Sequence, residues 1–107
     1  MPDDILYVLE KFQLAVLGFA TSLQSLRERL ADAYMSNFVQ LNPRDVPAEI
    51  RQEFQGLRNA LSRVSDGGKV GTLAISAATL SDDEARRLIQ SVVSMYEDVV
   101  ELASKGD

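Results

Sequence analysis

A chain of 107 residues, of which 46% are hydrophobic, can bury one modest core, so we expect a single domain over residues 1–107. The formal net charge of −5, from 16 acidic and 11 basic residues, disfavours binding to nucleic-acid phosphates or anionic membranes. The lack of cysteine and histidine excludes disulfides, the commonest zinc ligands, the commonest general base and cysteine nucleophiles. The enzyme chemistries that remain use carboxylate, lysine, tyrosine or hydroxyl groups.

The most apolar region, residues 5–20, predicts neither a membrane span nor an export signal. Glu10 and Lys11 interrupt it, and it is shorter than the roughly 20 residues that a transmembrane helix needs. Asp3 and Asp4 stand where a secretory signal would carry positive charge. We therefore expect a cytoplasmic protein with no membrane partner.

Capping residues and helix breakers divide the chain into four main predicted helices. Asp3 or Asp4 can cap the first helix, and the hydroxyl groups in "TSLQS" can cap the second. The prolines of "NPRDVP" break the second helix, and Pro47 suits the first position of the third. The glycines of "SDGGKVG" predict a flexible connection over residues 65–71. The four main helices are predicted over residues 4–20, 23–40, 47–64 and 82–104.

The segment "TLAISAATL" is ambiguous, because its apolar residues occupy both odd and even positions. It can form a buried strand or a short helix. A strand would have to pair, and no second segment of the chain shows strand patterning. We predict a short helix over residues 72–79, with an intermolecular strand pair as the alternative. The fold class expected is therefore all-α, a compact bundle of four main helices plus this one short segment.

The acidic run "SDDEARR" is interpreted as the start of the last helix. Ser81 precedes Glu84 by the spacing of a capping box, in which each side chain binds a backbone amide of the first turn. Asp82 and Asp83 fall in the same turn, where negative charge interacts favourably with the helix dipole. Consecutive helical side chains diverge by about 100°, so this run cannot converge on one ion by itself. We predict no metal site and no catalytic residue here.

A nucleotide site is not predicted in the glycine-rich segment around Gly67, Gly68 and Lys69. A phosphate-binding loop needs a glycine where Arg63 stands and a hydroxyl residue where Val70 stands. No other pattern in the chain indicates a cofactor or a small-molecule ligand. The sequence therefore predicts no cofactor.

The apolar faces of the helices are more informative than any motif. On the third helix the apolar residues form one stripe, on the last they cover about half the circumference, and on the first they lie almost all round. A domain of this size buries only about two thirds of its surface, so enclosing a whole helix is difficult. We expect the first helix to be completed by an intermolecular interface, with a central helix in a monomeric bundle as the alternative. The predicted interface residues are Leu6, Leu14, Leu17, Met35, Val39, Met95 and Val100.

Two further expectations concern the second and third helices. The second helix has an apolar stripe of Leu23, Leu26, Leu30, Tyr34, Phe38 and Leu41, and Met35 and Val39 lie away from it. Arg51 and Arg58 border the stripe of the third helix, where such charges could orient a partner helix. We interpret them instead as solvated side chains of little energetic effect.

These observations favour a non-enzymatic module for protein–protein interaction, such as an adaptor or a regulatory subunit. We expect it to form a homodimer or to bind another protein, through the first helix with help from the last. The alternative is an acidic inhibitor or immunity-type protein that occupies a basic site, because Glu97, Asp98 and Glu101 give the last helix an acidic side. A small enzyme is the weakest hypothesis, because only the cluster of Ser81 with its neighbouring acids supports it.

Overall fold

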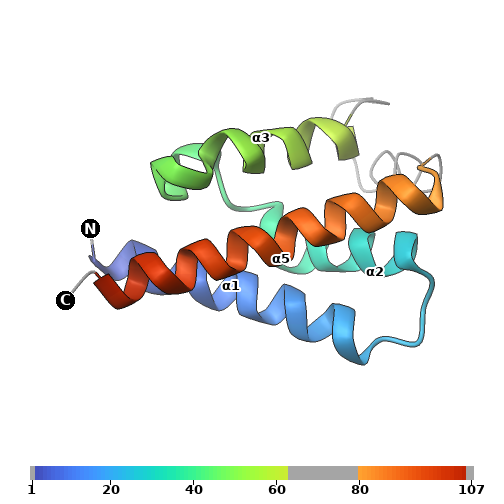
Figure 1. The fold of residues 1–107 in the computed structure, drawn as a ribbon, viewed down its shortest axis with the longest axis horizontal. Helices are drawn as coiled ribbons and strands as arrows, with labels where there is room; N and C mark the ends of the chain where they lie inside the picture. The colour runs from blue at the N-terminus through green and yellow to red at the C-terminus, as the bar shows by residue number, and fades with distance from the viewer. Residues whose placement is uncertain (1, 63–79, 106–107) are drawn as a thin grey trace.

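The computed structural model describes residues 2–62 and 80–105, and all regular elements in these two ranges are helical. Four main helices pack into one bundle (Figure 1), which confirms the predicted all-α class. The expected connection over residues 65–71 and the ambiguous segment over residues 72–79 lie outside the described residues. The elements are α1 (Pro2–Thr21), α2 (Leu26–Ala33), a π-helix (Tyr34–Phe38), a 3-10 helix (Pro43–Asp45), α3 (Ala48–Ser62) and α5 (Asp82–Lys105).

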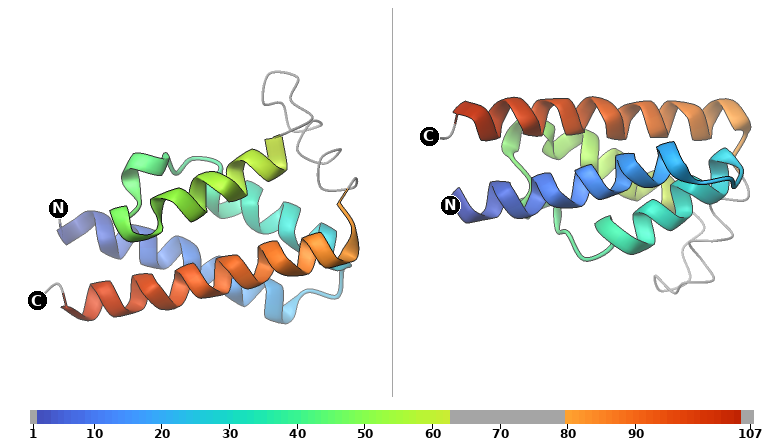
Figure 2. Two further views of the ribbon diagram at one scale, coloured as in Figure 1. Left: turned by 45° about the horizontal axis from the view of Figure 1, so that its top comes forward. Right: turned by 90° about the horizontal axis from the view of Figure 1, so that it is seen from below.

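Helix α5 is the central element of the packing, since it contacts α1, α2 and α3. Helices α1 and α5 lie side by side and run in opposite directions, so the ends of the chain lie at the same end of the bundle (Figure 1). Seen from below, α1 is drawn between α5 and α2 and contacts both (Figure 2, right), and α2 also contacts α5. One side of α1 is therefore left without a neighbouring helix among the described elements.

Helix α2 begins at Leu26, later than predicted, because Ser25 is its N-cap. The Ser25 hydroxyl accepts a hydrogen bond from the backbone amide of Glu28 (3.3 Å), and the Ser25 amide donates to the Glu28 carboxylate (3.1 Å). Leu23 precedes this cap and is fully exposed, so its predicted place in the apolar stripe is wrong. The other stripe residues are buried except for Leu26, which is half-buried.

The acidic run at the start of α5 forms the predicted capping box. The Ser81 amide donates to the Glu84 carboxylate (2.8 Å), and the Glu84 amide donates to the Ser81 hydroxyl (3.0 Å). Asp83 pairs with Arg86 on the next turn (3.0 Å), and Asp82 lies 3.6 Å from Arg27 of α2. Glu84 and Asp83 thus have partners in the first turns of α5 and Asp82 has one on α2, which confirms the interpretation as a helix start.

The S81A variant is expected to lose about 1 kcal/mol of unfolding free energy, because it leaves an amide of the first turn without its side-chain acceptor. Thermal or urea unfolding followed by circular dichroism measures this loss. Ser94, exposed in the middle of α5, provides the control, since S94A should be neutral or slightly stabilising. Equal stability of S81A and S94A would contradict a capping role for Ser81.

The centre of the core is a cluster of aromatic rings from three elements. Phe12 of α1 lies with its ring centroid 4.8 Å from that of Phe38 and 6.1 Å from that of Phe54 of α3. Phe38 and Phe54 meet edge to face at 5.8 Å, and Tyr34 packs edge-on against Phe38 at 6.3 Å. Burial raises the pKa of the Tyr34 hydroxyl, and the nearby positive charge of Arg58 partly opposes this effect. The cluster fixes which side of α1 faces inward.

Arginine side chains hold the connection between the π-helix and α3. The Arg51 guanidinium donates to the carbonyls of Pro43 and Val46, both at 2.9 Å, and that of Arg58 donates to the carbonyl of Leu41 at 2.9 Å. Arg51 is exposed and Arg58 half-buried, as expected for side chains at the border of the stripe, but the interpretation did not include these bonds to the backbone. Both residues donate hydrogen bonds to backbone carbonyl groups between the π-helix and α3. This segment has little regular secondary structure, so its own backbone amides provide few donors for these carbonyls.

Candidate interaction surface

Helix α1 has one buried face and one exposed apolar face. Val8, Phe12, Ala15 and Phe19 are buried in the core. Four large side chains on the opposite side remain exposed, and we call them the outer face of α1: Leu6 (60%), Tyr7 (46%), Leu14 (45%) and Leu17 (56%). At about 100° per residue these four fall within an arc of about 100°. The described parts of the chain therefore leave one side of the first helix exposed, contrary to the alternative of a central helix in a monomeric bundle.

The structure brings three of the predicted interface residues together, since Leu6, Leu14 and Leu17 all belong to the outer face of α1. Val39 and Val100 are also exposed, at 42% and 38%, but Val39 directly follows the π-helix and Val100 lies on α5. Met35 is half-buried and packs against the core. The predicted residues thus do not form one continuous set.

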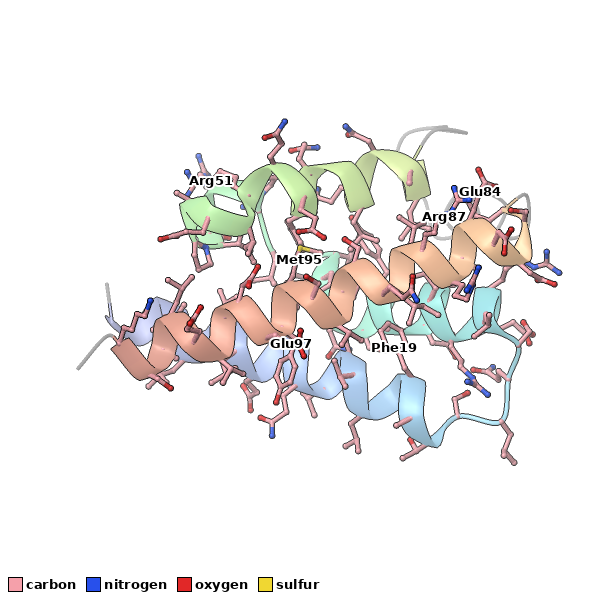
Figure 3. The ribbon with its side chains drawn as sticks, viewed as in Figure 1. Phe19, Arg51, Glu84, Arg87, Met95 and Glu97 are labelled. Atoms are coloured by element: carbon pink, nitrogen blue, oxygen red, sulfur yellow. The ribbon has the colours of Figure 1, made fainter. Side chains whose placement is uncertain are left out.

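The prediction that Met95 contributes to an interface is wrong. Its side chain is wholly buried and belongs to the core cluster. It lies on the side of α5 that faces α3 (Figure 3), and these two helices are also joined by a hydrogen bond from Ser91 to Glu53. Most of the broad apolar side of α5 is covered by neighbouring helices of the same chain, while Val100 remains exposed.

Tyr7 belongs to the outer face although it was not among the predicted interface residues. It precedes Leu14 by seven residues, a spacing that places both on the same side of a helix. The ammonium group of Lys11 lies 5.3 Å from the centroid of the Tyr7 ring, within the range of a cation–π interaction. The seven-residue spacing between Tyr7 and Leu14 was the feature of the sequence that could have placed Tyr7 on this face.

Two charged side chains lie on or beside the outer face of α1 among residues 5–21. Glu10 is exposed within its arc and Lys11 lies at its edge, and the start of the helix adds the acidic residues Asp3 and Asp4. The outward side of α5 differs, because Glu97, Asp98 and Glu101 are all exposed there. The polar side of α5 is seen in Figure 3, where Glu97 is labelled.

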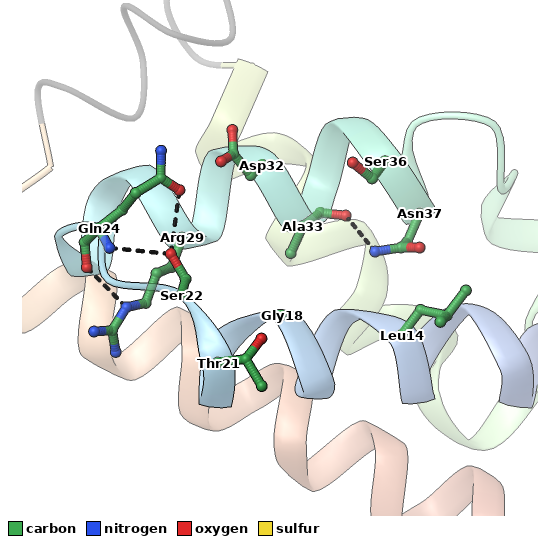
Figure 4. A pocket seen from close by; sticks show the side chains of 10 residues that line it. All are labelled: Leu14, Gly18, Thr21, Ser22, Gln24, Arg29, Asp32, Ala33, Ser36 and Asn37. Atoms are coloured by element: carbon green, nitrogen blue, oxygen red, sulfur yellow. Dashed lines mark hydrogen bonds between the residues drawn. The ribbon is translucent and has the colours of Figure 1, made fainter.

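A pocket of about 360 Å³ adjoins the outer face, between α1 and the segment formed by α2 and the π-helix (Figure 4). No heavy atom lies within 4 Å of the position that a Cβ atom on Gly18 would occupy, so the glycine opens the pocket on the side of α1. Arg29 and Asp32 bring one charge of each sign to the opposite wall. The lining residues are Leu14, Gly18, Thr21, Ser22, Gln24, Arg29, Asp32, Ala33, Ser36 and Asn37.

Hydrogen bonds order the wall of this pocket. The Arg29 Nε donates to the carbonyl of Gln24 (2.8 Å), and the Asn37 side-chain amide donates to the carbonyl of Ala33 (3.2 Å). Asn37 belongs to the π-helix, whose turn closes with a bond from the Val39 amide to the Tyr34 carbonyl (2.9 Å). Such turns have no reliable sequence signal, and sequence reasoning did not identify this one.

The described parts of the chain contain no group of three or more acidic, histidine or cysteine side chains placed to hold a metal ion. Among the helices of residues 2–62 and 80–105, none combines the length and the hydropathy that crossing a membrane requires. The chain matches no protein-family model, no curated protein and no solved structure at a significant level. The outer face of α1 and its adjoining pocket are thus the features on which a functional hypothesis can rest.

Proposed function

We propose that this chain is a non-enzymatic, cytoplasmic module for protein–protein interaction, an adaptor or regulatory subunit that binds its partner with the outer face of α1. The observation that supports this proposal is the exposure of four large apolar side chains along one side of one helix. Complete burial of a leucine side chain contributes about 1.5–3 kcal/mol, so covering three half-exposed leucines can contribute several kcal/mol in total. Hydrophobic burial would thus drive the association.

The L17E variant is expected to weaken association at least tenfold, because it places a carboxylate within the apolar contact. The matched control is Q52E, which adds the same charge at an exposed position of α3. Association is measured by light scattering of the purified chain over a range of concentrations, and by capture of partners on the immobilised chain. Circular dichroism verifies that both variants remain folded.

Equal association of L17E and Q52E would remove the outer face of α1 from the proposal. The same result would be expected if net charge, and not the position of the charge, governed binding. The pair of variants separates these cases because only one of them changes the outer face.

The second candidate function is that of an acidic inhibitor that occupies a basic site on another protein. The observation that favours it is the exposed acidic side of α5, with Glu97, Asp98 and Glu101. The affinity of such a complex falls steeply as salt is raised, whereas an apolar contact is much less sensitive. Binding measured at two salt concentrations distinguishes the two functions, since a salt-insensitive complex excludes the inhibitor.

A further inference from the structure

The exposed apolar surface of α1 lies next to an exposed apolar residue of α5. Helices α1 and α5 are antiparallel neighbours, and both ends of the chain lie at one end of the bundle, which we call the terminal end (Figure 1). At 1.5 Å per residue, Leu6 lies about 6 Å from the start of α1, and Val100 lies about 7.5 Å from the end of α5. Both residues are exposed. A partner that covers Leu6 is therefore within reach of α5.

The terminal end also carries most of the negative charge of these two helices. Residues 2–11 and 97–105 contain six acidic residues and two lysines, a formal charge of −4. The rest of α1, residues 12–21, contains no charged residue, and residues 86–96 of α5 contain two arginines and no acid. The acidity is therefore concentrated beside one half of the outer face.

Two of these acidic residues lie on the side of α5 toward α1. Glu97 follows Met95 by two residues, a rotation of about 200°, so it points away from α3, which Met95 faces. Figure 3 shows Glu97 on the side of α5 toward α1. Glu101 follows one turn later, and both residues are exposed. Glu10 of α1 and Glu97 each lie about 12 Å from the terminal end, so they are level with one another.

We infer that the partner on the outer face of α1 is a basic amphipathic helix of another protein. It lies along α1 with its apolar side on the outer face and its lysine or arginine residues over the acidic terminal end. This inference rests on the proposed function and specifies its partner. Within residues 2–62 and 80–105, Glu10, Glu97 and Glu101 have no ion-pair partner. Their carboxylates are open to cations from outside, and a basic partner is complementary to them.

A helix is the partner structure that fits this surface. The outer face is one side of a single helix and runs from Leu6 to Leu17, about 16 Å. A partner helix contacts such a face with residues spaced i, i+3, i+4 and i+7, whereas a partner strand needs an exposed sheet edge. All regular elements of the described ranges are helical. Packed helix axes lie about 8–10 Å apart, so long basic side chains of a helix on α1 can reach Glu97 and Glu101.

A second copy of this chain is a poorer partner for the same surface. The one basic residue of its α1 is Lys11, whose ammonium group already lies 5.3 Å from the centroid of the Tyr7 ring. Two copies would also bring together net charges of −5 each. Charge therefore favours a basic partner over self-association.

The test uses two labelled synthetic peptides of about 18 residues, long enough to form helix. Both have leucines spaced i, i+3, i+4 and i+7, and the positions beside them are lysines in the basic peptide and glutamates in the acidic one. Fluorescence anisotropy measures binding to the full chain at about 0.05 M and about 0.5 M salt, because the higher concentration screens exposed charges. At low salt the basic peptide is expected to bind at least tenfold more tightly than the acidic peptide.

The apolar half of the contact is tested with L17Q, which removes apolar surface without adding charge. This variant is expected to bind the basic peptide at least fivefold more weakly at both salt concentrations, because hydrophobic burial is not screened by salt. The control is L23Q, which makes the same change at a fully exposed residue outside α1 and should leave binding unchanged. Circular dichroism verifies that both variants remain folded.

The charged half of the contact is tested with a double variant that carries E97Q and E101Q. It is expected to bind the basic peptide about fivefold more weakly at low salt and less than about twofold more weakly at high salt. The control is a double variant that carries D32N and E49Q. It removes the same charge from exposed positions on α2 and α3, so it separates local complementarity from net charge.

Equal binding of the two peptides, or equal effects of the two double variants, would overturn the basic partner. If L17Q still weakens binding in that case, the outer face of α1 remains the binding surface and the proposed function stands. Loss of binding with E97Q and E101Q but not with L17Q would overturn both and favour the acidic inhibitor. A chain that dimerises through the outer face and binds neither peptide up to about 1 mM would identify a second copy as the partner instead.

Discussion

The F12A variant is expected to lose about 3–5 kcal/mol of unfolding free energy, the usual range for truncation of a buried phenylalanine. Phe12 is fully buried, and its ring contacts the rings of Phe38 and Phe54. Its removal thus leaves a cavity where α1, the π-helix and α3 meet. Urea unfolding followed by circular dichroism, with linear extrapolation to water, measures the loss.

The control for F12A is L6A on the same helix, because Leu6 is exposed. Surface substitutions of this kind usually change stability by less than about 0.5 kcal/mol. If F12A unfolds the chain completely, F12L provides a measurable variant, since a hydrophobic substitution of similar volume typically costs less than about 1.5 kcal/mol. Equal stability of F12A and L6A would show that the inward face of α1 has been assigned wrongly.

The sequence predicted the third helix well because that helix has only one apolar side. Its predicted stripe consists of Ile50, Phe54, Leu57, Leu61 and Val64; the first four are buried, and Val64 lies outside the described residues. The capping box at Ser81 could likewise be predicted, since its two residues are close in the sequence and its geometry is local. Predictions that depend on one helix or one turn were reliable in these cases.

The sequence could not determine which side of α1 is buried, because its apolar residues lie almost all round. That choice depends on the positions of Phe38 and Phe54, which come from other parts of the chain. The pocket was not predicted for the same reason, since its walls belong to α1 and to the segment of α2 and the π-helix. Gly18 was the available signal, because a glycine inside a helix costs about 1 kcal/mol relative to alanine and often has a packing or functional reason.

The M95A variant is expected to lose about 2–5 kcal/mol of unfolding free energy while the folded protein associates as before. The sequence placed Met95 at an interface because the apolar side of α5 is wider than one neighbouring helix can cover. The structure supplies more than one neighbour, since α1, α2 and α3 all contact α5. Met95 is therefore wholly buried within its own chain, where a partner cannot reach its side chain.

Val100 provides the control for M95A, because it lies on the same helix and is exposed. V100A should change stability by less than about 0.5 kcal/mol, so the difference between the two variants isolates the effect of burial. Urea unfolding gives the stability, and light scattering at a concentration where each variant is folded gives the association. If M95A weakened association without loss of stability, Met95 would belong to a surface that α3 leaves open. The packing of α3 against α5 would then have to be transient in solution.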